Sequence, residues 1–171
     1  KSSLVRRLEK QYGVKLSEEE ILITIGSKEA IGHFPLAVVD PGDLVLIPDP
    51  GYPVYYSSAI FAGADVHRMP LTESNDYWPR LGDIGDRDSE KARLMYLNYP
   101  NNPTSSTAPG ERFEEALEFC RRHDIILAND AAYSDIYYEQ PPAVLFPLAR
   151  DAGIPYIEFF SFSKTLSITG W

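Results

Sequence analysis

A lysine flanked by small hydroxyl residues follows an apolar run near the end of the sequence. Ser161, Ser163 and Lys164 lie in the stretch SFSKTL, directly after the strand-like residues YIEFF. A lysine amine at the end of a buried strand can lose its hydration, which lowers its pKa and makes it a nucleophile toward carbonyl groups. A loop lysine is, however, usually exposed to solvent. Taken alone, this stretch is compatible with both interpretations.

A carboxylate and an amide end two other apolar runs. Asp130 is the last residue of IILAND, where it could pair with a cationic ring nitrogen or simply form a turn or helix cap. Asn102 lies in NNPT, which is a turn signal and could also present an amide to a ligand oxygen. Neither residue alone decides between the structural and the functional interpretation.

Two further segments have the residue types of a ligand-binding turn. Gly26, Ser27 and Lys28 join an apolar run to a helical pattern, so backbone N–H groups there could bind a phosphate or could belong to an ordinary capped turn. Tyr52 in DPGYP could stack on a planar ligand or pack on the core. The sequence contains neither a Walker motif nor a G-x-G-x-x-G motif, which argues against a nucleotide site.

Composition excludes several other classes of protein. The net charge of −9 and the pI of about 4.8 argue against a nucleic-acid partner, since such proteins usually carry a basic face. No run approaches the roughly 20 apolar residues of a membrane span, so we expect no membrane association. Three scattered histidines and one cysteine, Cys120, give no metal site and fit a reducing compartment. No targeting signal is visible, so we expect a cytoplasmic protein.

Six short apolar runs read as strands, and amphipathic helical patterns alternate with them. This alternation predicts an α/β fold with a mostly parallel sheet and helices on both faces. The predicted strands are 21–25, 44–48, 64–70, 93–100, 125–130 and 156–161.

The helical patterns have recognisable ends. A first helix ends at Gly13, a second opens at Gly26 and contains Pro35, and a third covers about 54–62. A fourth helix has Thr107 as its expected N-cap and Pro109 as an early helical residue. Its predicted buried face consists of Phe113, Ala116, Leu117 and Cys120.

In open parallel sheets, ligands bind at the carboxyl ends of the strands. The segments that could carry chemistry all follow predicted strands: 26–28, 98–104, 130–133 and 161–164. We therefore expect them to lie at one edge of the sheet.

The order of these segments carries more information than any one of them. Together they resemble the class I and II aminotransferases, which use pyridoxal 5′-phosphate, and most closely the branch that contains LL-diaminopimelate, alanine and aspartate aminotransferases. The resemblance extends over essentially all 171 residues. It rests on the motifs GSKEAI, PGD, DPGYPVY, NYPNNPT, NDAAYSDI and SFSKTLSITGW, which occur in the family's order and spacing.

The resemblance implies a role for each segment. Lys164 matches the lysine that forms a Schiff base with the cofactor and then moves the substrate proton. Asp130 matches the aspartate that pairs with the pyridine nitrogen and keeps it protonated. Asn102 and Tyr133 match residues that hydrogen-bond the phenolic oxygen of the cofactor. Tyr52 matches the ring that stacks on the pyridine. The residues that match the phosphate site are Ser27, Lys28 and Ser161, with Ser163 ranked lower.

The resemblance also implies an activity and partners. We expect an enzyme that transfers an amino group from an amino acid to a 2-oxo acid in amino acid metabolism, and that works as a homodimer. Two alternatives remain: a lyase, decarboxylase or synthase on the same cofactor scaffold, and an aminotransferase-like domain of a non-catalytic regulator. Residues 1–171 would form the central part of the cofactor-binding large domain, without the N-terminal segment and the C-terminal small domain.

Two departures from the family pattern are visible. Ser105 replaces the glycine of the usual NPTG motif, which we expect to be tolerated if the φ angle there is negative. The phosphate-binding arginine of the family would be the residue after Trp171, where this sequence ends. We therefore expect that the chain alone is not catalytically competent.

Overall fold

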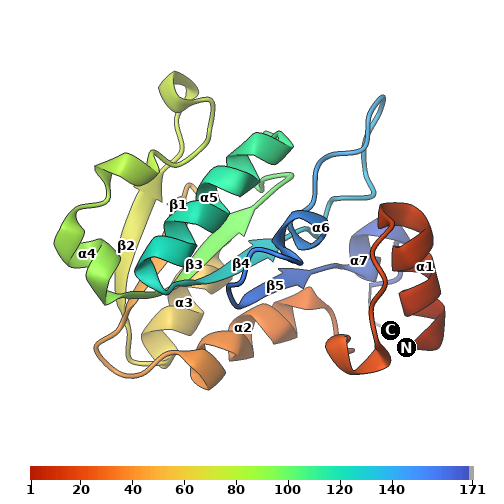
Figure 1. Ribbon diagram of the computed structural model, residues 1–171, viewed down its shortest axis with the longest axis horizontal. Helices are drawn as coiled ribbons and strands as arrows, with labels where there is room; N and C mark the ends of the chain where they lie inside the picture. Colours follow the sequence, from red (N-terminus) through yellow and green to blue (C-terminus); the bar gives the residue numbers. More distant parts are fainter. Residues whose placement is uncertain (170–171) are drawn as a thin grey trace.

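The structure is a computed structural model that describes residues 1–169, and Figure 1 shows a sheet with helices on both sides. Gly170 and Trp171, the last two residues of the motif SFSKTLSITGW, lie outside the described residues.

The sheet has five strands in the order β2-β1-β3-β4-β5. Every neighbouring pair is parallel, which confirms the predicted α/β fold. The strands are β1 (Leu44–Asp49), β2 (Asp65–Pro70), β3 (Ala92–Asn98), β4 (Ile126–Asp130) and β5 (Tyr156–Phe159).

Successive residues of the inner strands face two separate hydrophobic clusters. In β1, Leu44 and Leu46 belong to one cluster, whereas Val45 and Ile47 belong to the other. Helices α5 (Gly110–His123) and α6 (Leu145–Ala149) contribute to the first cluster, and α2 (Ser27–Val38) and α3 (Pro53–Phe61) contribute to the second. Because a parallel strand between two helical layers is buried on both sides, its sequence reads as a continuous apolar run.

Helix α5 confirms the predicted buried face and corrects the predicted start. Phe113, Ala116 and Cys120 are fully buried, as the helical spacing requires. The helix begins at Gly110 and its N-cap is Pro109, so the prediction of Thr107 as N-cap was wrong. With a ψ angle of 162°, Pro109 is extended, so the chain turns into the helix only after the proline.

The predicted strand at residues 21–25 was wrong. These residues belong to no helix or strand, and the side chains of Leu22 and Ile25 are 81% and 82% exposed. Apolarity alone suggested burial here, but a strand also needs a neighbour for its backbone groups, and no strand of the described sheet pairs with this segment.

The remaining helices are short or lie at the periphery. Figure 1 shows α1 (Ser2–Tyr12) beside α7 (Phe162–Thr165), so two segments from opposite ends of the sequence meet. Helix α1 ends as predicted at Gly13, which has a φ angle of 73°. The other short helices are η1 (Glu18–Glu20), which follows α1, and η2 (Glu73–Asn75), η3 (Leu81–Asp83) and α4 (Asp86–Lys91), which lie between β2 and β3.

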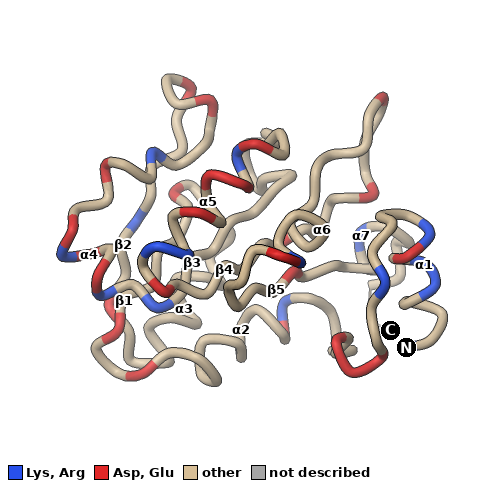
Figure 2. The backbone as a smooth tube through the Cα atoms, in the orientation of Figure 1, with Lys and Arg blue, Asp and Glu red and all other residues tan. Residues whose placement is uncertain are grey.

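Charged residues of both signs occur on α5. Figure 2 shows acidic and basic residues interspersed on α5, where Glu118 pairs with Arg121. Among the described residues, no helix has the length and apolar character needed to cross a membrane.

Glu158 is a carboxylate that joins β5 to α6. Its oxygens accept hydrogen bonds from the backbone N–H groups of Leu145 and Phe146 at 2.9 and 2.8 Å, and from Asn129 Nδ2 at 2.8 Å. Burial raises the pKa of Glu158 to about 7, despite these three donors. The carboxylate therefore fixes the start of α6 against the sheet, at a cost in stability that depends on pH.

We expect the pH dependence of the free energy of unfolding to differ between Glu158→Gln and the unsubstituted protein. As pH rises from about 4.5 to about 7, the unfolded glutamate loses its proton before the folded one does. Glu158 therefore lowers the stability of the unsubstituted protein over this range, by up to about 1.4 kcal/mol per pH unit, and the variant lacks this contribution. Urea unfolding of both proteins from pH 4 to 8 measures the difference, and a difference that is constant over this range would contradict the assignment.

Candidate functional site

The strand order of the sheet reverses between β1 and β3: later strands are added on one side of β1 and on the opposite side of β3. From β1 the chain passes through α3 to β2 on one side, and from β3 it passes through α5 to β4 on the other. In such a sheet, the carboxyl ends of the two strands at the switch point form the crevice where ligands bind. The loops that follow β1 and β3 contain Tyr52 and Asn102, so both predicted site residues lie in the loops at the switch point.

Strand register places Asn98 opposite Asp130 at the ends of β3 and β4. Asn98 Nδ2 donates to the backbone oxygen of Asp130 at 2.7 Å, and Asn98 Oδ1 accepts from the backbone N–H of Asn102 at 2.8 Å. The side chain of Asn98 thus joins the loop that contains Asn102 to the end of β4.

The Asp130 side chain is buried, with an exposed fraction of 5%. Its Oδ2 accepts a hydrogen bond from the Tyr55 hydroxyl at 2.7 Å, and its Oδ1 accepts one from the backbone N–H of Ala132 at 3.2 Å. Loss of hydration raises the pKa of Asp130, while these two donors and the positive charge of Lys164 lower it. The carboxylate is therefore a buried acceptor whose ionised form needs nearby donors or a cation.

Lys164 lies in α7, and its positive charge is close enough to lower the pKa of Asp130. Of the two interpretations that the sequence left open, the exposed lysine is the one found, because Lys164 is exposed in the described chain. Helix α7 has no buried residue, so nothing in the described part of the molecule covers this amine.

The two predicted serines differ in their surroundings. Ser161 is buried and is the N-cap of α7, where its backbone oxygen accepts from the N–H groups of Lys164 and Thr165 at 3.2 and 3.3 Å. Ser163 is half-buried within the same helix. Ser161 therefore starts the turn that presents Lys164.

Ser27 and Lys28 are the first two residues of α2 and follow Gly26, which has a φ angle of 74°. The first N–H groups of a helix have no acceptor within the helix and are available to an anion. Helix α2 packs against the sheet through Phe34, whose ring lies edge-on to Phe159 of β5 at 5.9 Å, and its Ile31 oxygen accepts from the Tyr96 hydroxyl at 3.1 Å.

Tyr52, Asn102 and Tyr133 are half-buried. Tyr52 is the N-cap of α3, and its ring lies edge-on to that of Tyr55 at 5.9 Å. Within residues 1–169, the side chains of Asn102 and Tyr133 make no hydrogen bond. Their polar groups are therefore available to a ligand, and their assignment to the site stays a prediction.

Sequence reasoning did not identify Tyr55, and it included Asn98 only as the first residue of the segment 98–104, without a role. Tyr52 is the N-cap of α3 and Tyr55 follows it by three residues, which places both rings on one face of the helix start. Asn98 is the last residue of its strand. Helical spacing and the strand-end rule could therefore have indicated both residues, although neither rule gives their partner.

A hollow of about 430 Å³ lies beside the edge strand β2 and the segment that follows it. Its lining includes His67, Arg68 and Arg80, and none of the predicted site residues. The candidate site is therefore a group of strand and helix ends rather than this hollow.

Comparison with known proteins gives consistent matches. The family described as aminotransferase class I and II matches residues 1–171. An LL-diaminopimelate aminotransferase of Nitratidesulfovibrio vulgaris (strain DP4) is 46% identical over 168 residues, which cover 95% of this chain and 42% of the relative. One from Aquifex aeolicus (strain VF5) is 47% identical over 155 residues, covering 89% and 39%. The chain thus spans less than half the length of these relatives.

Solved structures match the whole described fold. The substrate-bound structure of BacF from Bacillus subtilis superposes with a TM-score of 0.94 at 38% identity, covering 99% of this chain and 43% of that one. A probable N-succinyldiaminopimelate aminotransferase from Thermus thermophilus has a TM-score of 0.91 at 35% identity, covering 99% and 45%.

Ser105 does not meet the condition under which we expected it to be tolerated, because its φ angle is 62°. Left-handed backbone costs a residue with a side chain roughly 1–2 kcal/mol, and glycine avoids most of this cost. We expect Ser105→Gly to raise the free energy of unfolding by up to about 1 kcal/mol, since greater freedom of the unfolded chain offsets part of the gain. Urea unfolding measures this change.

Ser57→Gly is the matched control, because Ser57 lies within α3. There the same substitution should lower the free energy of unfolding by about 0.5–1 kcal/mol. A loss of stability in both variants would show that Ser105 is not strained.

Tyr55→Phe should raise the pKa of Asp130 further, because it removes a donor that stabilises the ionised carboxylate. A hydrogen bond to a charged group contributes about 1.5–3 kcal/mol, so we expect a loss of stability of that order at pH values where Asp130 is ionised. The ¹³C chemical shift of the Asp130 carboxyl, followed against pH, measures the pKa.

Tyr96→Phe is the control, because the Tyr96 ring stacks on Tyr55 at 4.9 Å while its hydroxyl donates to Ile31 instead. If the pKa of Asp130 changes by the same amount in Tyr55→Phe and Tyr96→Phe, the Tyr55 hydroxyl has no specific role in setting this pKa.

Proposed function

This chain belongs to the class I and II aminotransferases, and we propose that the protein that carries it is a pyridoxal-phosphate-dependent aminotransferase. It would transfer an amino group from an amino acid to a 2-oxo acid. The observation that carries the proposal is the buried Asp130 carboxylate at the strand ends, with the Lys164 amine close enough to lower its pKa.

The chemistry of the described side chains fits the cofactor. A buried carboxylate with two donors, on Tyr55 and Ala132, is suited to a cationic ring nitrogen, which would compensate its lost hydration. The N-terminus of α2, which has 12 residues, offers backbone N–H groups and a favourable dipole to a phosphate. An exposed lysine amine is available to a carbonyl group.

We assign the predicted residues accordingly. Asp130 would pair with the ring nitrogen, and Tyr52 would lie against the ring. Asn102 and Tyr133 would donate to the phenolic oxygen, which their lack of other partners within residues 1–169 permits. The residues proposed for the phosphate are Ser27, Lys28 and Ser161, with Ser163 nearby.

Pyridoxal 5′-phosphate supplies an aldehyde and a ring that accepts electrons. The chain's own residues supply positions and protons. Lys164 Nζ would take the proton from the substrate Cα and act as general acid and base. Tyr55 and Ala132 would keep the Asp130 carboxylate ionised, and Asn98 would hold the loop of Asn102 at the strand ends.

We propose an amino acid of the diaminopimelate type as substrate. The support is that the relatives at 46% and 47% identity are LL-diaminopimelate aminotransferases. We further propose a cytoplasmic homodimer, in which residues 1–171 form the central part of the large domain. These proposals rest on the family and on the relatives.

The test is covalent labelling of the whole protein that carries this chain. We expect added pyridoxal 5′-phosphate to give a visible absorbance band, and borohydride reduction followed by mass spectrometry to place the label on Lys164. Lys164→Ala should abolish the band, whereas Lys15→Ala should keep it, because Lys15 lies in the segment after α1. Label on another lysine, or on none, would refute the assignment of Lys164.

Formation of a 2-oxo acid from a diaminopimelate-type donor then tests the reaction. The expected product appears only when both the amino donor and a 2-oxo acid acceptor are present. Release of carbon dioxide or ammonia in place of amino transfer would instead indicate a decarboxylase or lyase on the same scaffold.

A further inference from the structure

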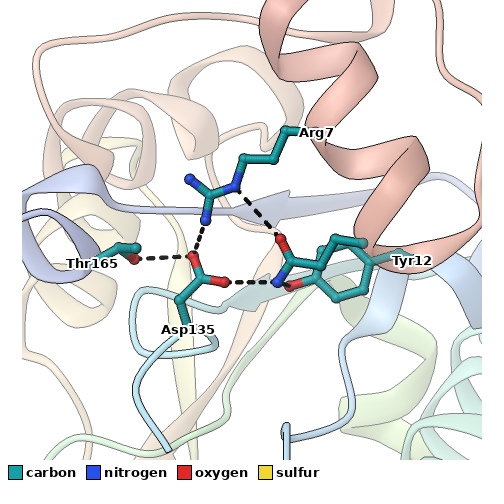
Figure 3. A network of polar contacts seen from close by, with 5 residues as sticks. Arg7, Tyr12, Asp135 and Thr165 are labelled. Carbon is teal, nitrogen blue, oxygen red and sulfur yellow. Dashed lines mark hydrogen bonds and ion pairs between the residues drawn. The ribbon is translucent and has the colours of Figure 1, made fainter.

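Three segments that are distant in the sequence meet at the carboxylate of Asp135, as Figure 3 shows. Asp135 Oδ2 accepts from Arg7 Nη2 of α1 at 2.7 Å and from the Thr165 hydroxyl of α7 at 3.1 Å. Its Oδ1 accepts from Gln11 Nε2 of α1 at 2.7 Å. The side chain of Asp135 is only 16% exposed, so these contacts form in a partly shielded environment.

Helix α7 depends on this group of contacts for its position. It consists of four residues, none of them buried, so it has no apolar anchor of its own in the described chain. Two of its side chains are held from outside: Thr165 by Asp135, and Phe162 by Arg7, whose guanidinium lies 5.6 Å from the ring centre. The ion pair between Arg7 and Asp135 therefore contacts both the first and the last residue of α7.

The ion pair is in turn fixed to the body of the molecule. Gln11, which donates to Asp135, also donates to the Tyr12 hydroxyl at 3.0 Å. The Tyr12 ring lies edge-on to Phe146 of α6 at 5.1 Å and packs on Phe160 at 6.3 Å. Because α6 belongs to the hydrophobic core, Asp135 links the exposed turn α7 to a rigid support through α1.

Sequence position relates this network to the proposed site. Lys164 is the neighbour of Thr165, and Tyr133 lies in the same turn as Asp135, just after β4 ends at Asp130. One carboxylate thus joins the segment that contains Lys164 to the segment that contains Asp130 and Tyr133.

We propose that Asp135 is a positioning residue for Lys164. Through Thr165 and Arg7, it holds α7 so that the amine of Lys164 stays directed toward the strand ends where Asp130 lies. This inference rests on the proposed function, since it concerns the same lysine. Asp135 itself does not touch the reacting atoms.

The experiment measures the rate at which pyridoxal 5′-phosphate becomes attached to Lys164 in the whole protein, by borohydride trapping at successive times. Asp135→Asn and Thr165→Val should each slow attachment roughly fivefold, the effect of one lost hydrogen bond. Thr165→Ser keeps the hydroxyl and should restore most of the rate. Because Thr165 donates to Asp135, the effects of the two changes in the double variant should be less than additive.

Asp124→Asn is the charge-matched control. Asp124 forms an exposed ion pair with Arg93 at 3.4 Å after α5, and asparagine suits its φ angle of 53°. It should label at the rate of the unsubstituted protein. Because Thr165 lies in a turn without buried residues, Thr165→Val tests the proposal even if Asp135→Asn does not fold.

The outcomes separate the two proposals. Slow labelling of Lys164 in Thr165→Val, with a normal rate in Asp124→Asn, supports the positioning role. Labelling at the unsubstituted rate in Asp135→Asn and Thr165→Val overturns it and leaves the proposed function intact. If the unsubstituted protein does not label at Lys164 at all, the proposed function fails, and the positioning role fails with it.

Discussion

The burial of the Asp130 carboxylate is the constraint on which the candidate site depends. A carboxylate that loses its hydration is costly unless donors surround it, and here the Tyr55 hydroxyl and the Ala132 N–H do so. Tyr55 can reach Asp130 only because α3 packs on the face of the sheet that contains Val45 and Tyr96. The aromatic stack of Tyr55 and Tyr96 is therefore both hydrophobic core and support for the charged group.

Sheet topology brings the remaining groups to the same place. The change of direction between β1 and β3 separates α3 and α5 onto opposite faces, which leaves the strand ends free of covering helices. Asn98 then uses its amide to connect two neighbouring strand ends. A parallel sheet thus supplies the backbone positions, and a few polar side chains fix the loops that extend from it.

Much of this arrangement could be predicted from the sequence, because buried parallel strands such as 44–48 and 125–130 are marked by continuous apolar runs. The same signal failed at 21–25, since apolarity does not say whether a neighbouring strand exists. Residue type could indicate Asp130 and Lys164, but the hydrogen bond from Tyr55 and the ion pair of Arg7 with Asp135 depend on tertiary packing. The positive φ angle of Ser105 was equally inaccessible, because serine does not require it.

The ion pair between Arg7 and Asp135 spans 128 positions of the sequence. Such a contact cannot form early in folding, because the entropy of closing so long a loop must first be offset by the pairing of the strands between its ends. All strand pairs of this sheet are parallel and hence also non-local. The turn that contains Lys164 should accordingly be among the last parts of the described chain to take its native position during folding.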